Sequence, residues 1–310
     1  MRRTVLCFWR VAAFAMLIGA SAGAQVPTGA SAPDYHPMVE IQREDLAQAR
    51  SHFTTQILRS GPPPAEWDDL IAPTGAHEVT YPSGALRLKA WIGAPVSGDA
   101  TKHAAILFLH SGFDLEAGDW DLAQPFRDAG YIVMMPTMRG ENGQHGVFTM
   151  YYNEVDDAIH AGEYLRSQSF VDPDQMFVAG YSVGGVLALL AAEIYPYFRA
   201  AASISGSPDQ ALYLKYAKGA RLNAPFDPDD LREVQLRSPL AYAASFKCPI
   251  GLYYGTQEAY YTFVQARTAE IARAHGVDAQ AIAVEGDHGS NVPKSMHLAL
   301  EFFQKMQEKR

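Results

Sequence analysis

The segment that constrains the fold most is a serine between glycines, placed where an apolar run gives way to a helix-forming one. Residues 176–179 are apolar and predict a short buried strand, which enters a Gly-x-Ser-x-Gly turn centred on Ser182. Residues 186–192 contain only valine, leucine and alanine and predict a helix. This context is typical of a nucleophile elbow, a turn so tight that only glycine fits beside the serine. We therefore expect Ser182 on a strained corner at a helix N-terminus, where negative charge is favoured.

Residues 76–310 alternate between apolar runs and helical stretches. Two runs with period-two alternation, 77–81 and 86–92, flank a Pro-Ser-Gly turn and predict an antiparallel hairpin at a sheet edge. Apolar strands are then expected at 104–109, 131–136, 176–181, 200–205, 250–254 and 280–284, with helical stretches at about 117–129, 151–168, 184–195, 259–275 and 291–307. This alternation predicts an α/β fold, a mostly parallel central sheet with helices on both faces. Residues 207–246 interrupt it and form either a cap over the site or a surface excursion.

The first 24 residues have the pattern of a secretory signal peptide. Residues 1–3 carry positive charge, residues 11–18 form an apolar core, and residues 22–24 are a small-residue cleavage site. A membrane anchor is the alternative, but Arg10 interrupts the apolar run, which is shorter than the roughly 20 residues that a span needs. We therefore expect a secreted or periplasmic protein with no membrane span after signal removal.

Residues 25–75 are expected to contribute a lead-in and one accessory helix before the catalytic domain. Residues 25–40 are rich in Pro, Gly, Ala and Ser, which indicates a flexible segment. Residues 43–58 have helical spacing, and a Gly-Pro-Pro-Pro run from Gly61 ends it. No recognisable chemistry lies in this region.

Charge and residue usage exclude several classes of partner. The chain has 34 acidic and 25 basic residues, a net charge of −9, which argues against a nucleic-acid partner. The ten histidines form no His-Glu-x-x-His motif, and Cys248 is the only cysteine outside the signal segment, so we expect neither a metal site nor an intrachain disulfide. A Gly-rich phosphate loop is also absent, and no cofactor is expected. The sequence does not indicate an oligomeric state.

A nucleophilic serine needs a histidine and an orienting carboxylate at other strand ends. Glu258 follows the predicted strand at 250–254, and His288 follows the one at 280–284. Both therefore fall at carboxyl ends of parallel strands, in the order serine, acid, histidine that is typical of such sites. We predict Ser182 as the nucleophile, His288 as the general base and then acid, and Glu258 as the group that orients the imidazole.

Other assignments of the acid and the histidine stay open at this point. Asp209 follows the preceding strand and is the alternative acid. Glu258 has a second interpretation as a first-turn glutamate that only stabilises its helix dipole, and His288 as a turn residue that caps the next helix. Asp287 is unsuitable as the orienting acid, because neighbouring side chains in extended backbone diverge.

An oxyanion needs at least two hydrogen-bond donors aimed at the developing charge. The N–H of Val183, next to the nucleophile, is the first candidate. The loop after the strand at 104–109 supplies the second, the N–H of Gly112 or of Ser111. In the same loop, His110 is either an electrophile or a loop-orienting residue. Arg139, after the next strand, either clamps a substrate carboxylate or braces its own loop.

Several of these segments resemble one known family. Residues 171–185 resemble the nucleophile segment of the prolyl oligopeptidase and dienelactone hydrolase branch of the α/β-hydrolases. Residues 238–240, followed by 248–250, are similar to the lead-in to that family's acid. Residues 287–289 resemble its histidine turn, and residues 139–140 its loop after the fourth strand.

The resemblance covers about residues 76 to 307 and implies the α/β-hydrolase fold with serine-hydrolase activity. Two features depart from the family pattern. Its acid is commonly aspartate, whereas Glu258 stands here. Its peptidase members carry a β-propeller before the catalytic domain, which residues 25–75 are too few to build. The resemblance therefore implies a free-standing hydrolase.

These observations predict a secreted serine hydrolase that acts on a carboxylic ester, a lactone or a related small acyl substrate through an acyl-enzyme. An exopeptidase or amidase with the same residues is the first alternative. A non-catalytic binding protein on the same fold is the second, because fold does not determine function. The presence of all three triad residue types argues against the second.

Overall fold

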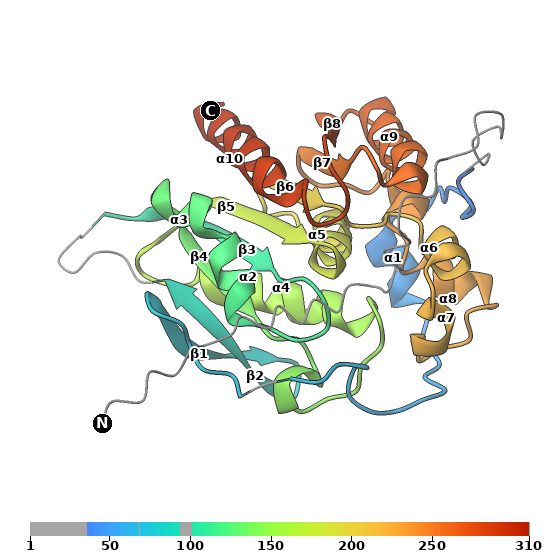
Figure 1. Ribbon diagram of the computed structural model, residues 1–310, viewed down its shortest axis with the longest axis horizontal. Coiled ribbons are helices and arrows are strands. Elements are labelled where there is room, and N and C mark those ends of the chain that lie inside the picture. Colours follow the sequence, from blue (N-terminus) through green and yellow to red (C-terminus); the bar gives the residue numbers. More distant parts are fainter. Residues whose placement is uncertain (1–35, 68, 94–100, 310) are drawn as a thin grey trace, which may run out of the picture.

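The computed structural model describes residues 36–67, 69–93 and 101–309 (Figure 1). The predicted signal peptide, residues 1–24, and most of the lead-in lie outside the described residues. Export therefore stays a prediction.

An eight-stranded sheet forms the centre of the molecule, in the order β1-β2-β4-β3-β5-β6-β7-β8 (Figure 1). The strands are β1 (Ala76–Ser83), β2 (Leu86–Gly93), β3 (His103–Leu109), β4 (Ile132–Pro136), β5 (Val171–Tyr181), β6 (Ala200–Ile204), β7 (Ile250–Gly255) and β8 (Ala279–Val284). β1 and β2 form an antiparallel hairpin at one edge, β2 pairs antiparallel with β4, and all the other pairs are parallel. This topology confirms the predicted α/β fold.

Helices cover both faces of the sheet. Alternate residues of β3 show the two layers, because side chains alternate across a strand. Leu107 and Leu109 belong to one core, with α4 (Asn153–Arg166), α5 (Val183–Ile194) and α9 (Ala259–Ala274). Ile106 and Phe108 belong to the other, with α2 (Ala117–Leu122), α3 (Gln124–Asp128) and α10 (Val292–Glu308). The helical stretch predicted at 117–129 is thus two short helices.

The accessory helix predicted over residues 43–58 is wrong in its extent. The observed helix, α1, is only Leu46–Ser51. Beyond it, the hydroxyl of Thr55 and the backbone N–H of Gln56 donate to the carboxylate of Glu233, at 2.8 and 2.6 Å. A tertiary partner therefore replaces the intrahelical bonds that the local pattern favoured.

Residues 207–246 contain three short helices, α6 (Gln210–Tyr216), α7 (Ala220–Asn223) and α8 (Leu231–Gln235), and the 3₁₀ turn η2 (Pro239–Tyr242). In Figure 1 they lie beside α1 and the chain around it. Backbone N–H groups of Gln42 and Leu58 donate to carbonyls of Ala241 and Pro225, each at 2.7 Å. The N-terminal segment and the insertion therefore form one continuous layer.

A buried ion pair fastens the insertion to the loop that precedes α4. Arg237 is fully buried, and its Nη1 lies 2.5 Å from Oε2 of Glu233. The same guanidinium donates to the carbonyls of Thr149 and Met150. Met150 and Tyr151 both have positive φ, at 51° and 65°, a backbone conformation that non-glycine residues adopt only when their surroundings hold it.

Glycines make the turn between β5 and α5 possible. A Cβ on Gly180 would lie 2.1 Å from the carbonyl oxygen of Gly184, and one on Gly184 would lie 2.0 Å from the carbonyl oxygen of Leu109. Both clashes involve backbone atoms, which a rotamer change does not relieve. The turn therefore brings α5 into direct backbone contact with the end of β3.

We expect Gly184→Ala to lower the free energy of unfolding by about 3 kcal/mol or more, because the added methyl forces α5 away from β3. Gly118→Ala, in α2, is the matched control, since its Cβ meets no atom within 4 Å. It should leave stability unchanged or raise it by up to about 1 kcal/mol. Urea unfolding measures both, and equal stability of the two variants would contradict the packing described.

Candidate active site

Three side chains from distant segments meet at the carboxyl ends of β5, β7 and β8. Nε2 of His288 lies 3.0 Å from Oγ of Ser182, and Nδ1 of His288 lies 2.6 Å from Oε1 of Glu258. Parallel strands end at the same edge of a sheet, which explains why residues up to 106 positions apart come together. The structure thus joins all three residues of the predicted triad in one hydrogen-bonded relay.

The backbone holds Ser182 in the strained corner expected of an elbow. Its φ is 55° and its ψ is −114°, immediately before the first residue of α5. Its N–H donates to the carbonyl of Ile204 on β6 at 2.8 Å, which fixes the turn against the neighbouring strand. The hydroxyl is therefore presented at a helix N-terminus, next to the imidazole.

Glu258 is a buried carboxylate with partners on both oxygens. It is 7% exposed, and Oε1 faces the imidazole. Oε2 accepts hydrogen bonds from the N–H of Gly255 at 2.6 Å and from the hydroxyl of Ser205 at 2.7 Å. A carboxylate held in this way keeps the orientation that receives the Nδ1 proton of His288.

Asp209, the alternative acid, has a different role. It is fully buried and begins α6, where its Oδ1 accepts the N–H of Leu212 at 3.0 Å. Its Oδ2 accepts the N–H groups of Met38 and Val39, at 2.6 and 3.3 Å. The structure therefore places Glu258, not Asp209, beside His288.

Tyr181 and Ser205 contact the relay, although their sequence positions predicted no role for them there. The ring of Tyr181 lies 5.3 Å from that of His288, and its hydroxyl donates to the His288 carbonyl at 3.1 Å. Burial raises the pKa of Tyr181, so this hydroxyl stays a neutral donor. The sequence pattern predicts Ser205 only as the last residue of the strand at 200–205. A polar residue before glycine at the carboxyl end of a parallel strand was the signal that could have identified it.

Two N–H groups in the loop after β3, those of Ser111 and Gly112, were candidate oxyanion donors. One of them already has an acceptor in the protein, and the other does not. The N–H of Ser111 donates to Oδ1 of Asp119 at 3.1 Å, as does its hydroxyl at 3.0 Å. The N–H of Gly112, whose φ is 67°, has no acceptor among the residues the structure describes. Val183 is the first residue of α5, so its N–H has no intrahelical acceptor. The geometry therefore favours Val183 and Gly112.

His110 is a buried residue that orients this loop. It is 2% exposed, and its Nε2 lies 3.0 Å from Oε2 of Glu141. Burial lowers the pKa of His110, but the charge and hydrogen bond of Glu141, together with the charge of Asp119 and the hydrogen bond to Ser111, raise it to about 10. At neutral pH both ring nitrogens therefore carry protons, and Nδ1 donates to the carbonyl of Ser111 at 2.9 Å. In a trans peptide the C=O and N–H point in opposite directions, so this bond turns the Gly112 N–H away from the imidazolium.

Arg139 braces its own loop. Its Nε and Nη2 donate to the two oxygens of Asp157, at 2.8 and 2.7 Å, and Asp157 is fully buried. Of the two interpretations of Arg139, the bracing one fits the structure, because the guanidinium fork is already paired.

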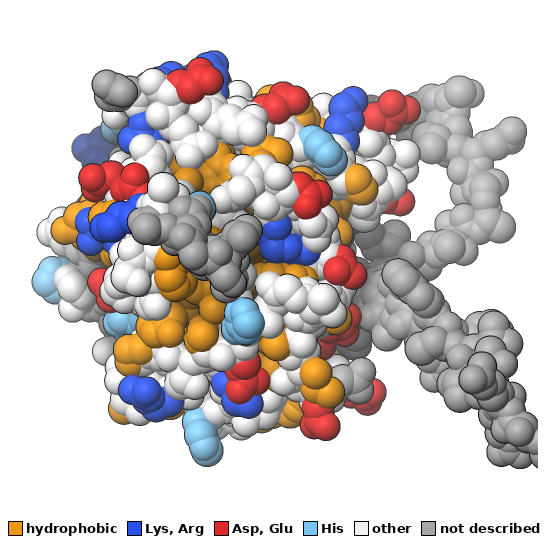
Figure 2. Space-filling view, turned by 90° about the vertical axis from the view of Figure 1, so that its left-hand side faces the viewer, with side chains coloured by type: hydrophobic (Ala, Val, Ile, Leu, Met, Phe, Trp, Pro, Cys, Tyr) orange, Lys and Arg blue, Asp and Glu red, His pale blue; other side chains and the backbone are white. Residues whose placement is uncertain are grey.

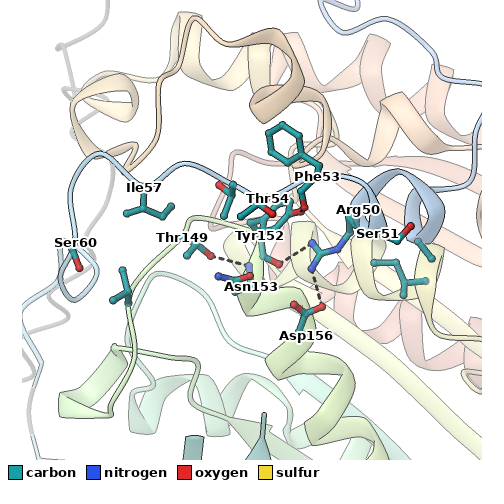
Figure 3. Close-up of a pocket in the computed structure, with 14 residues that line it drawn as sticks. Arg50, Ser51, Phe53, Thr54, Ile57, Ser60, Thr149, Tyr152, Asn153 and Asp156 are labelled. Atoms are coloured by element: carbon teal, nitrogen blue, oxygen red, sulfur yellow. Dashed lines mark hydrogen bonds and ion pairs between the residues drawn. The ribbon is translucent and has the colours of Figure 1, made fainter. Parts of the chain in front are cut away.

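A groove of about 800 Å³ lies away from the relay, between α1, the chain that follows it and the start of α4 (Figure 3). Within it, Arg50 donates to the carbonyl of Tyr152 at 2.9 Å and to Oδ1 of Asp156 at 2.8 Å. Neither Ser182 nor His288 nor Glu258 lines this groove, so its shape says nothing about the catalytic residues.

Residues 36–67, 69–93 and 101–309 lack the features of several other kinds of site. This part of the chain has no cluster of three or more His, Cys, Asp or Glu that could hold a metal ion. None of its helices is both long and apolar enough to cross a membrane. Cys248 is buried, which raises its thiol pKa to about 12 and makes it a poor nucleophile. On the face in Figure 2, acidic and basic side chains are interspersed without a continuous basic stripe.

Comparison with known proteins gives a family match and structural relatives. Residues 119–310 match the model of the Prolyl oligopeptidase family. The uncharacterized peptidase YtmA of Bacillus subtilis (strain 168) is 23% identical over 194 residues, which are 59% of this chain and 73% of that protein.

Two of the similar solved structures are a peptidase and an esterase. The Pyrococcus horikoshii acylaminoacyl peptidase has a TM-score of 0.64 and 20% identity, over 74% of this chain and 41% of that one. A thermophilic esterase from Thermogutta terrifontis, Est2, has a TM-score of 0.58 and 21% identity, over 75% of this chain and 93% of that one. The chain thus spans about two fifths of the peptidase and nearly all of the esterase.

The His110 and Glu141 pair predicts a pH-dependent contribution to stability. The pKa of His110 rises from about 6.5 in the unfolded chain to about 10 in the folded one, so the contribution is complete below pH 6.5 and disappears as pH rises through 10. We expect Glu141→Gln to lower the unfolding free energy by roughly 3 kcal/mol or more at pH 7, and by much less at pH 10.5.

Asp156→Asn is the control for this experiment, because the ion pair of Asp156 with Arg50 contains no histidine. Its smaller effect should be the same at pH 7 and 10.5. Urea unfolding at several pH values measures both differences. An effect of Glu141→Gln that does not change with pH would contradict an imidazolium at His110.

Proposed function

The chain belongs to the prolyl oligopeptidase family of serine hydrolases, and from this premise we propose that it cleaves a carboxylic ester, lactone or related small acyl compound through an acyl-enzyme intermediate. The observation that carries the proposal is the relay at one edge of the sheet, with 3.0 Å between Ser182 and His288 and 2.6 Å between His288 and Glu258.

In the proposed reaction, Oγ of Ser182 attacks the substrate carbonyl while Nε2 of His288 takes its proton. The carboxylate of Glu258 stabilises the imidazolium that forms. The N–H groups of Val183 and Gly112 receive the developing oxyanion. His288 then protonates the leaving group, the Ser182 ester forms, and water, deprotonated by the same imidazole, releases the acid.

One observation supports an ester or lactone over a peptide. The likeness to the Thermogutta terrifontis esterase extends over nearly all of that protein, whereas the likeness to the acylaminoacyl peptidase is confined to 41% of it.

The second candidate is an exopeptidase or amidase. It is favoured by the family match and by the peptidase label of the Bacillus subtilis relative. The same residues would serve, with a heavier demand on His288, because an amine leaving group has to be protonated before it departs.

A fluorophosphonate probe tests the nucleophile. We expect wild type to be labelled on Ser182 and Ser182→Ala to be unlabelled. Glu258→Gln should lower kcat by about 10³- to 10⁴-fold, because it removes the charge that holds and stabilises the imidazole. Asp209→Asn, which keeps a helix-capping side chain, should stay within about threefold of wild type. A folded wild-type protein that takes no label, or a larger loss in Asp209→Asn than in Glu258→Gln, would refute the assignment.

A substrate panel separates the two candidates. We expect kcat/KM for short-chain aryl esters to exceed that for matched aminoacyl arylamides by about 100-fold or more, because the ester leaving group needs less protonation. Ser182→Ala, measured in parallel, sets the background for both series. Amide turnover equal to or above ester turnover would favour the peptidase instead.

A further inference from the structure

Ser205 combines backbone strain with a contact to the relay. It follows β6 directly, is 1% exposed and has a φ of 49°. Its N–H donates to the carbonyl of Tyr253 on β7 at 2.7 Å, which holds the strained residue between two strands. A glycine at position 205 would adopt this conformation without strain, yet a serine occupies the position. Strain that the surroundings maintain at such a place points to a function for the side chain.

The direction of the Ser205 hydrogen bonds follows from their partners. Nδ2 of Asn291, a donor, lies 3.1 Å from Oγ of Ser205, and Oε2 of Glu258, an acceptor, lies 2.7 Å from it. A hydroxyl carries one proton, so Ser205 accepts from the amide and donates to the carboxylate. The orientation of the amide is set in turn by Ser295, whose hydroxyl donates to Oδ1 of Asn291 at 2.8 Å.

Asn291 also ties this network to the segment that carries the histidine. Its Nδ2 lies 2.5 Å from the carbonyl oxygen of Asp287 and 3.2 Å from that of His288. Asn291 and Ser295 are both fully buried, at the start of α10. One amide therefore connects the histidine turn, through Ser205, to the acid that the histidine faces.

We infer that Ser205 is a positioning residue, whose hydroxyl, oriented by Asn291, fixes the second oxygen of Glu258 so that the first stays aimed at His288. The inference rests on the proposed function. Glutamate has one more rotatable bond than aspartate, so its carboxylate has more freedom to lose before it aligns with an imidazole. The N–H of Gly255 holds Oε2 from one side and Ser205 from the other, and together they remove that freedom.

The test uses two substitutions that differ in backbone strain. Ser205→Ala removes the hydroxyl and keeps the strain, whereas Ser205→Gly removes both. We expect each to lower kcat between about tenfold and a hundredfold with KM nearly unchanged, because a misaligned acid affects the chemical step. Ser205→Gly should nevertheless unfold at the same temperature as wild type or higher. A role in folding alone would instead give Ser205→Gly the wild-type kcat, and that result would overturn the inference.

Ser203→Ala is the matched control. Ser203 is also fully buried, lies two residues earlier in β6, and its hydroxyl has no hydrogen-bond partner among the described residues. Its kcat should stay within about twofold of wild type. A loss equal to that of Ser205→Ala would show a general effect of removing a hydroxyl from this strand and would overturn the inference.

A double-mutant cycle tests the route through the acid. In the Glu258→Gln background, adding Ser205→Ala should change kcat by less than about twofold, because the group on which Ser205 acts is already altered. Reductions that multiply would overturn the inference. Fluorophosphonate labelling of wild type keeps the two hypotheses apart. An unlabelled wild type refutes the proposed function, whereas a labelled, active wild type with fully active Ser205 variants refutes only the role of Ser205.

Discussion

The backbone contact between the N-terminus of α5 and the end of β3 is the constraint on which the rest of the site depends. Because Gly184 has no side chain, the helix approaches the carbonyl of Leu109 to a distance that no Cβ would permit. This approach puts the turn that contains Ser182 and Val183 against Leu109 and His110, at the start of the loop that contains Gly112. A wider turn would separate Ser182 from the loop that contains Gly112.

Several buried ionisable side chains around the site have partners that hold their loops in place. His110 and Glu141 hold the loop after β3, while Arg237 and Glu233 hold the strained loop before α4. Glu258 has hydrogen-bond partners on both oxygens. A buried charge without a partner destabilises the fold by several kcal/mol. Removal of one member of such a pair therefore leaves the other as an uncompensated buried charge.

The N-terminal segment shows how tertiary contacts override a local pattern. Its sequence has helical spacing far beyond Ser51, yet the chain leaves the helix to bind Glu233 and Pro225 of the insertion. Contacts within the same layer also explain why Asp209 is not part of the relay. In sequence it stands where an acid of a triad could stand, but in the fold its carboxylate is used by the backbone of Met38 and by the start of α6. Chain order alone left both carboxylates possible, and hydrogen bonding separates them.

The sequence by itself determined the fold class and the three residues of the relay. Strand periodicity, the glycine-flanked Ser182 and the order of Glu258 and His288 are local patterns with strong physical causes. Only the tertiary structure decided what depends on distances between segments. It showed that Asp209 caps helix α6, that Arg139 pairs with Asp157, and that the N–H of Ser111 donates to Asp119. It also brought Ser205 and Asn291 to the acid, because partners far apart in the chain leave no periodic signal before the sheet aligns their strand ends.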